Sequence, residues 1–145
     1  MARNKDIVRR MSDEVYSQGK TEVLDEICAE GYVNHDPLGG DMTKEEEKAL
    51  IASYRHAFPD FEVKVLRTFE EEGYACVHWR AGGTHEGELM DVEPTGRYSS
   101  VEGIDIARID GGKIHEVWRS FDTLQFMRNI GVIAAVEEEE PRPSA

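Results

Sequence analysis

The sequence has few cysteines, few basic residues and no long hydrophobic run, and each shortage excludes a class of protein. Its 145 residues include two cysteines, Cys28 and Cys76, whose spacing matches no metal-ligand or redox motif. A reducing compartment is the simplest reading, so we expect a cytoplasmic protein. No apolar stretch approaches the ~20 residues that a membrane-spanning helix needs. The polar N-terminus lacks the apolar segment of a signal peptide, so none is expected.

The shortage of basic residues excludes two kinds of partner. Lys and Arg number 17 against 30 Asp and Glu, which gives a formal net charge of −13. Such a chain is repelled by nucleic acids and by anionic membranes, and we expect neither as a partner.

The length favours one domain that buries its own core. We place that domain at residues 1–136 and expect residues 137–145, which are acidic and contain prolines, to form a disordered tail.

Hydrophobic spacing predicts helices in the first part of the chain and strands in the second. Apolar residues at helical spacing, and a capping-box sequence at 43–46, predict three early helices. Alternating residues predict four later strands, and a short helix follows the last one. The predicted helices are 4–17, 21–29, 43–58 and 123–130, and the predicted strands are 61–69, 74–85, 97–109 and 112–122. This order indicates an α+β fold in which helices collect on one side of a curved, mostly antiparallel sheet.

The last predicted strand carries an unusual set of side chains. Side chains on a strand alternate between its two faces. Strict alternation puts Glu116, Trp118 and Asp122 on one face, and Arg119 and Phe121 on the other. A face that mixes tryptophan with carboxylates resembles the wall of a ligand pocket more than it resembles a plain core. We therefore predict a pocket on the Trp118 face.

Asp122 has two interpretations that can both hold. It begins the last predicted helix, and Gln125 stands at the third helical position, which is typical of a helix cap. Alternatively, a carboxylate surrounded by aromatic groups loses hydration, which raises its pKa and suits it to act as a general base.

Two histidines are further candidates for the site. His35 lies in a predicted turn and His85 at a predicted strand end, and each taken alone is more typical of a structural residue. Together they could donate hydrogen bonds to substrate carbonyl groups. Histidine and aspartate are also common metal ligands, and the candidates of these types are His35, Asp36, His85 and Asp122. No short ligand spacing such as His-x-x-x-His occurs, however. We therefore expect no metal site and no cofactor.

Several short motifs carry a resemblance to a known family. Along the chain these motifs are Asn34-His35-Asp36-Pro37, Ala57-Phe58-Pro59-Asp60-Phe61, Gly83-Thr84-His85-Glu86-Gly87-Glu88, Pro94-Thr95-Gly96-Arg97, the segment 112–118 and Asp122. In this order they resemble the SnoaL-like polyketide cyclase family of the NTF2-like superfamily, over about residues 4–133.

The resemblance implies a fold and a reaction. The expected fold is a cone-shaped α+β barrel with a deep apolar pocket, assembled as a homodimer or higher homo-oligomer, often through the outer sheet face. The expected reaction is an acid/base-catalysed intramolecular aldol closure of a carbonyl-rich, hydrophobic polyketide ester, without metal or cofactor. It assigns Asp122 as the acid/base. The resemblance and the predicted faces together make His35 and His85 the further expected catalytic residues. The expected substrate-binding residues are Trp118, Trp79, Phe58, Glu116 and Tyr32.

Other functions on the same pocket stay open. One is a non-catalytic carrier or sensor of a small molecule. Another is a different NTF2-like isomerase or hydrolase, including an epoxide hydrolase. Epoxide hydrolysis would require an Asp–Arg–Asp-like polar cluster that holds a water molecule. Because the predicted strand turns Arg119 away from Asp122, we rank that reading low.

Overall fold

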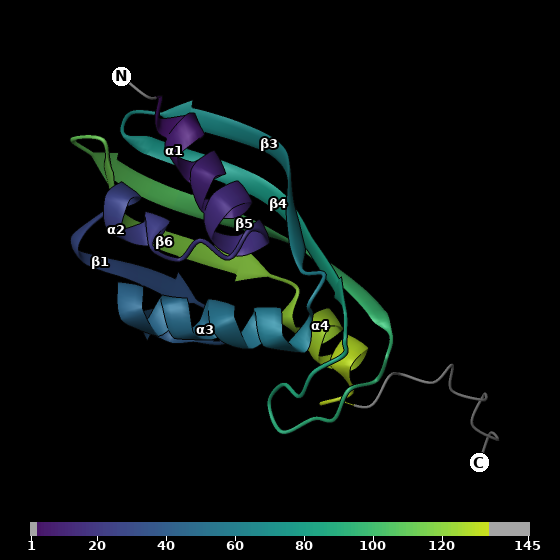
Figure 1. Ribbon diagram of the computed structural model, residues 1–145. Helices are drawn as coiled ribbons and strands as arrows, with labels where there is room; N and C mark the ends of the chain where they lie inside the picture. The colour runs from purple at the N-terminus through teal and green to yellow at the C-terminus, as the bar shows by residue number, and fades with distance from the viewer. Residues whose placement is uncertain (1–2, 134–145) are drawn as a thin grey trace, which may run out of the picture.

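The computed structural model describes residues 3–133 as a curved six-stranded sheet with helices packed on one side (Figure 1). This arrangement confirms the predicted α+β class. The helical elements are α1 (Asn4–Arg10), the π-helix η1 (Met11–Ser17), α2 (Val23–Ile27), α3 (Lys44–Ala57) and α4 (Thr123–Ile130). The strands are β1 (Cys28–Asp36), β2 (Gly40–Met42), β3 (Glu62–Glu71), β4 (Tyr74–Thr84), β5 (Tyr98–Asp110) and β6 (Lys113–Phe121).

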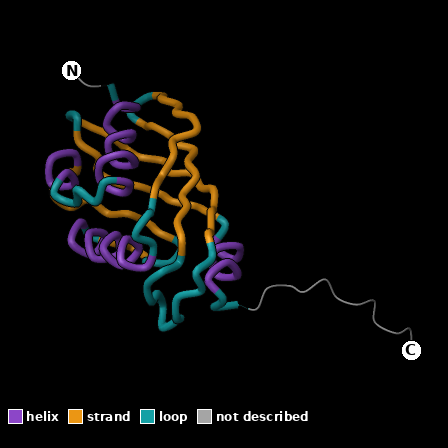
Figure 2. The backbone as a smooth tube through the Cα atoms, turned by 45° about the vertical axis from the view of Figure 1, so that its right-hand side comes forward, coloured by secondary structure: helices purple, strands orange, loops and turns teal. Residues whose placement is uncertain are grey.

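The sheet has the order β2-β1-β6-β5-β4-β3. Strands β3 to β6 form an antiparallel meander, and β1 joins its open side parallel to β6. The helices η1, α2 and α3 lie against the concave face, as the tube view shows (Figure 2). Because the first strand, β1, pairs with the last strand, β6, residues from both halves of the chain meet in the middle of the sheet.

The predicted helix boundaries need two corrections. The helix expected at 4–17 is α1 running directly into η1, whose wider turns still bury Met11 and Val15. The helix expected at 21–29 ends at Ile27, because Cys28 already adopts extended backbone and begins β1. Hydrophobic spacing over so few residues does not separate a short helix from a buried strand end.

The third helix begins as its sequence predicts. Thr43 accepts a hydrogen bond from the Glu46 amide, and the Glu46 carboxylate accepts one from the Thr43 amide, so both halves of the capping box are present. This cap fixes where α3 starts. The start in turn sets the phase of the helix, which places Glu47 and Ile51 on its fully buried side.

The most consequential feature of the sheet is a bulge in β6. Ile109 pairs with Ile114, but the next residue of β5, Arg108, pairs with Glu116, so His115 is an extra residue. A bulge of this kind reverses the alternation of all residues beyond it. Both Ile114 and Val117 are therefore buried, and Arg119 faces the concave side with them.

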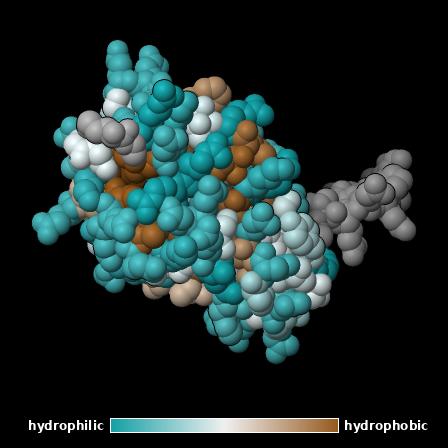
Figure 3. Space-filling view, turned by 45° about the horizontal axis from the view of Figure 1, so that its top comes forward, coloured by the Kyte–Doolittle hydropathy of each residue, from teal (hydrophilic) through white to brown (hydrophobic). Residues whose placement is uncertain are grey.

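The concave face and the helices enclose the main hydrophobic core, and a second, smaller cluster around Phe58 and Phe126 lies near α4. In the view of Figure 3, polar side chains cover most of the surface and apolar ones show in the gaps between them. None of the helices within residues 3–133 combines the length and apolar character that a membrane span requires. The predicted tail at 137–145 lies outside the described residues.

Candidate active site

A pocket opens between the concave face of the sheet and the helices. The pocket and its open mouth hold about 600 Å³ of empty space. Its wall is mainly aromatic and comes from helices, loops and strands alike: Tyr54, Phe58, Phe61, Trp79, Phe121 and Phe126. Three charged residues, Asp36, Asp105 and Arg119, also line it. The pocket therefore has an apolar body and one charged wall, which is a usual design for a small-molecule site.

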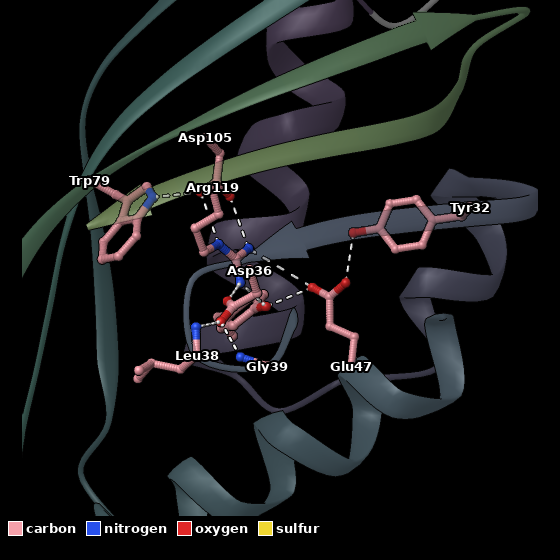
Figure 4. Close-up of polar contacts among 9 residues, drawn as sticks. Tyr32, Asp36, Leu38, Gly39, Glu47, Trp79, Asp105 and Arg119 are labelled. Atoms are coloured by element: carbon pink, nitrogen blue, oxygen red, sulfur yellow. Dashed lines mark hydrogen bonds and ion pairs between the residues drawn. The ribbon is translucent and has the colours of Figure 1, made fainter. Parts of the chain in front are cut away.

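Arg119 is the centre of the charged wall (Figure 4). Its Nε and Nη2 donate to the two carboxylate oxygens of Asp105, each at 2.9 Å. Its Nη1 donates to the Tyr16 hydroxyl at 2.6 Å and to Asp36 Oδ2 at 3.3 Å. The exposed fraction is 6% for the Arg119 side chain and 1% for that of Asp36. A buried guanidinium held in this way is both rigid and charged.

Neighbouring strands bring these three residues together. The parallel register of β1 and β6, in which His35 lies opposite Trp118, brings Asp36 next to Arg119. Asp105 lies directly opposite Arg119 in the antiparallel pair of β5 and β6. Arg119 therefore sits between two carboxylates because its strand lies between the two strands that carry them.

Asp36 is fixed by the turn that follows it. One of its oxygens, Oδ1, accepts hydrogen bonds from the amides of Leu38 and Gly39, both at 2.8 Å. An aspartate before a proline commonly binds the amides two and three residues on. Among the residues that the structure describes, its second oxygen, Oδ2, has only the longer contact with Arg119. Asp36 therefore keeps one oxygen with spare hydrogen-bonding capacity.

Asp105 is bound more completely. Besides its two bonds from Arg119, its Oδ1 accepts a hydrogen bond from the Trp79 indole at 3.0 Å. With these three hydrogen bonds made, Asp105 mainly holds Arg119 in place.

A second layer of polar groups lies behind the charged wall. Glu47, fully buried on α3, accepts hydrogen bonds from the hydroxyls of Tyr16 and Tyr32, both at 2.6 Å. Its Oε2 lies 3.9 Å from Arg119 Nη2. Three carboxyl groups, those of Asp36, Glu47 and Asp105, thus surround the Arg119 guanidinium.

The charged wall alters the acidity of its neighbours. Burial alone would lower the pKa of Arg119, but the charge of Asp105 and the contacts with Tyr16 and Glu47 raise it well above its ordinary value. Burial raises the pKa of Tyr16 well above its ordinary value, and burial together with the charge of Asp36 raises the pKa of Tyr54. Arg119 is therefore a permanent cation, and both tyrosines stay protonated as hydrogen-bond donors.

The structure does not place Asp122 in the pocket. Asp122 is exposed and caps α4, where its Oδ1 accepts a hydrogen bond from the Gln125 amide at 3.0 Å. The predicted position inside an apolar pocket is wrong, because the bulge at His115 turns Arg119 and Phe121 inward instead. The helix-cap interpretation of Asp122 is the one that the structure shows.

Three other predicted pocket residues lie on the outer face of the sheet: Trp118 and Glu116 because of the same bulge, and His35 because it alternates on β1 with the buried Asn34 and Asp36. Trp118 is 39% exposed there, and Glu116 lies beside it. His35 stacks on Trp118, with ring centroids 5.7 Å apart, and bonds to Glu116. The predicted pocket positions of Trp118, Glu116 and His35 are therefore wrong.

The remaining predicted residues lie at or behind the pocket wall. Trp79 and Phe58 line it. Tyr32 lies one layer behind, bonded to Glu47. His85 is fully buried behind Phe58, whose ring centroid is 5.5 Å away. Its Nδ1 accepts a hydrogen bond from the Thr95 amide, and its Nε2 has no hydrogen-bond partner within residues 3–133.

Asp36, Asp105 and Arg119 are the site residues that sequence reasoning missed. In β5 the outward positions hold Ile104 and Ile106, while the inward positions around Asp105 hold glycine and alanine. Alternation alone therefore places the isoleucines inside and the aspartate outside. The available signal was Asp36 itself, which lies within a recognised motif. Within the described residues, no three His, Cys, Asp or Glu side chains converge as a metal site would require.

Known structures define the class of this fold. TsrD from Streptomyces laurentii matches with a TM-score of 0.78 and 21% identity, over 92% of this chain and 99% of that one. AclR from Streptomyces galilaeus matches with a TM-score of 0.81 and 21% identity, over 92% of this chain and 84% of that one. These matches confirm the predicted NTF2-like α+β fold, with a pocket enclosed between the curved sheet and its helices.

The sequence comparisons specify the family. The model of the SnoaL-like polyketide cyclase family matches residues 6–130. Aklanonic acid methyl ester cyclase DnrD from Streptomyces peucetius is 31% identical over 127 residues, covering 83% of this chain and 87% of that protein. The corresponding cyclase DauD from Streptomyces sp. (strain C5) is 31% identical over 122 residues, covering 80% of this chain and 75% of that protein. The chain belongs to the SnoaL-like polyketide cyclase family.

We expect the fold to depend strongly on Arg119. In Arg119→Leu, three buried carboxyl groups lose the guanidinium that they contact, which should lower the free energy of unfolding by about 3–5 kcal/mol. Urea denaturation monitored by tryptophan fluorescence measures the change. The matched control is Arg80→Leu, which removes an exposed ion pair with Glu102 and should cost less than about 1 kcal/mol. Equal losses in the two variants would contradict this account of the cluster.

Proposed function

We propose that this protein closes a ring in a carbonyl-rich, hydrophobic polyketide ester by a cofactor-free, acid/base-catalysed intramolecular aldol reaction. The observation that carries the proposal is the buried Asp36–Arg119–Asp105 cluster on the charged wall of an aromatic pocket. Membership of a family with two relatives named aklanonic acid methyl ester cyclase supports it. The aromatic body would hold a flat, apolar substrate, and the charged wall would meet its carbonyl groups.

The acid/base role fits Asp36 better than Asp122. Asp36 lines the pocket and keeps Oδ2 free of short hydrogen bonds, whereas Asp122 is exposed at a helix start. In our mechanism, Asp36 Oδ2 takes a proton from a carbon flanked by carbonyl groups, which leaves an enolate. Asp105 takes no part in proton transfer in this mechanism and holds Arg119 in its orientation, while the Trp79 indole holds Asp105.

The following steps return the proton and leave the enzyme unchanged. The enolate oxygen is stabilised by the charge of Arg119 and by the Tyr54 hydroxyl, which both face the pocket. The enolate carbon then attacks a carbonyl carbon of the same molecule, forming one carbon–carbon bond and an alkoxide. Asp36, now protonated, gives its proton to that alkoxide. Because both reacting groups belong to one molecule, a pocket that folds the substrate correctly supplies much of the rate enhancement.

The test uses aklanonic acid methyl ester, the compound in the names of the two relatives, as the probe. Asp36→Asn should lower kcat by about 10²–10⁴-fold, which is the usual contribution of a general base. Its amide oxygen can still accept from Leu38 and Gly39, so the fold should be retained. Product formation followed by absorbance and mass spectrometry measures the effect.

The matched control is Asp122→Asn, because asparagine caps a helix as well as aspartate does. It should retain turnover within about twofold. Loss of turnover in Asp122→Asn together with an active Asp36→Asn would return the acid/base role to Asp122. Binding of the probe by the wild-type protein without any product would favour a carrier or sensor instead.

Epoxide hydrolysis is a second candidate, favoured by one specific observation. Arg119 faces inward and lies between two aspartates, Asp36 and Asp105, which is the arrangement that epoxide hydrolysis requires. The fully buried amide of Asn34, two residues before Asp36, has no hydrogen-bond partner within the described residues and could hold a water molecule. If this candidate is correct, an apolar epoxide incubated in ¹⁸O-labelled water should give a diol carrying one labelled oxygen. An unchanged epoxide would exclude it.

We also propose that two copies of the chain associate through the outer face of the sheet. The register aligns Phe69, Cys76, Ile106 and Trp118 in one row across β3 to β6. Three of these side chains are large, apolar and exposed, and Ile104 and Tyr74 adjoin them. Apolar area of this kind is a common mark of an interface.

The free cysteines Cys28 and Cys76 support a reducing compartment such as the cytoplasm.

Ile106→Glu should convert the expected dimer into a monomer, because it places a charge in the middle of the row. Size-exclusion chromatography with light scattering measures the mass. Leu124→Glu is the control, since Leu124 is similarly exposed but lies on α4, and it should remain dimeric. A monomeric wild-type protein at micromolar concentration would contradict the proposal.

A further inference from the structure

His35 lies on the outer face of the sheet and connects three strands. Its Nδ1 lies 2.7 Å from Asp41 Oδ1 on β2, and its Nε2 lies 2.6 Å from Glu116 Oε2 on β6. A carboxylate only accepts hydrogen bonds, so both ring nitrogens must donate, and the bridging form is the protonated imidazolium. This Asp41–His35–Glu116 bridge belongs to no part of the mechanism described above.

The bridge lies next to the turn that holds Asp36. Strand β2 is only three residues long and is an edge strand paired with β1 alone. His35 lies directly opposite Asp41, and the next pair, Asp36 opposite Gly40, closes the turn. That turn carries the Leu38 and Gly39 amides that bind Asp36 Oδ1. Three residue pairs stabilise so short an edge strand only weakly. An additional ionic contact at its centre therefore contributes to the stability of the β1–β2 pairing.

We propose that His35 is a positioning residue whose bridge to Asp41 and Glu116 clamps the β1–β2 hairpin and so keeps the Leu38 and Gly39 amides on Asp36. This inference rests on the proposed acid/base role of Asp36. The clamp holds the turn, the turn fixes Oδ1 of Asp36, and the fixed carboxylate directs Oδ2 toward Arg119 and the pocket. The outer face of the sheet thereby controls the geometry of a group on the inner face.

The clamp is expected to weaken as the pH rises. The charged groups that face His35 are Asp41 from β2 and Glu116 from β6. Behind Glu116, Arg108 on β5 approaches its other oxygen at 3.6 Å. The hydrogen bonds to Glu116 and then to Asp41 raise the pKa of His35 above its ordinary value. The clamp is therefore complete below this raised pKa and is lost as the pH rises through it.

The first experiment measures the clamp without using activity. Amide hydrogen exchange of Leu38 and Gly39 is followed by NMR across the titration of His35 in the wild-type protein and in His35→Gln. Glutamine cannot carry the charge, so these amides should exchange at least about threefold faster in the variant at low pH. At high pH the two proteins should converge. Equal exchange at every pH would overturn the proposal.

The matched control is His78→Gln. His78 lies on the same outer face and contacts Glu102 at 3.3 Å, but it lies on β4, away from β2. This variant should leave Leu38 and Gly39 exchange unchanged. A similar acceleration in His78→Gln would show a general effect of the outer face and would also overturn the clamp.

The second experiment separates this inference from the proposed function. With aklanonic acid methyl ester as the probe, wild-type kcat should fall on the alkaline side, and His35→Gln should show a low kcat without that fall and with KM within about twofold. If Asp36→Asn stays active, the proposed acid/base role of Asp36 fails while the exchange result still decides the clamp. If Asp36→Asn is inactive and His35→Gln keeps the wild-type pH profile, the clamp fails alone.

Discussion

The structure depends on the burial of one guanidinium among three carboxyl groups. Each of these charges would be costly in the interior by itself, and only their mutual contacts make the burial possible. The arrangement requires four separate elements to meet, since Asp36, Glu47, Asp105 and Arg119 come from β1, α3, β5 and β6. The parallel addition of β1 beside β6 is what allows this meeting. The sheet order and the site are therefore set by the same strand pairing.

The pocket separates two tasks between its parts. The aromatic body, with Phe58, Phe121 and Phe126 packed at angles to one another, offers shape and apolar area without any reactive group. The charged wall offers a fixed cation and a carboxylate with one free oxygen. In the proposed mechanism, a substrate held by the first part presents its carbonyl groups to the second. Substrate choice and chemistry can thus change independently across the family, which accords with one fold carrying many reactions.

The sequence predicted the fold class well and the site poorly, for identifiable reasons. The capping box at Thr43 is a local signal, and it survives into the structure. Which face of a strand is inside is not local. Alternation in β5 points Ile104 and Ile106 inward, yet both face outward because the outer face is itself apolar. In β6 the extra residue His115 has no sequence signature, so every assignment beyond it was reversed. Asp122 failed for this reason, while its helix cap, a local feature, was foreseen.

The bulge at His115 decides which side chains of β6 face the pocket. Upstream of it, Ile114 packs in the core, and downstream Arg119 joins the charged wall. If the same residues paired with β5 without a bulge, the alternation beyond Ile114 would shift by one, and Trp118 and Ser120 would face inward in place of Arg119. Deletion of His115 itself would remove the bulge and leave Ile114, Val117 and Arg119 on one face, since their partners on β5 already alternate along one face. The charged wall therefore tolerates the loss of the extra residue but not its inclusion in a regular ladder.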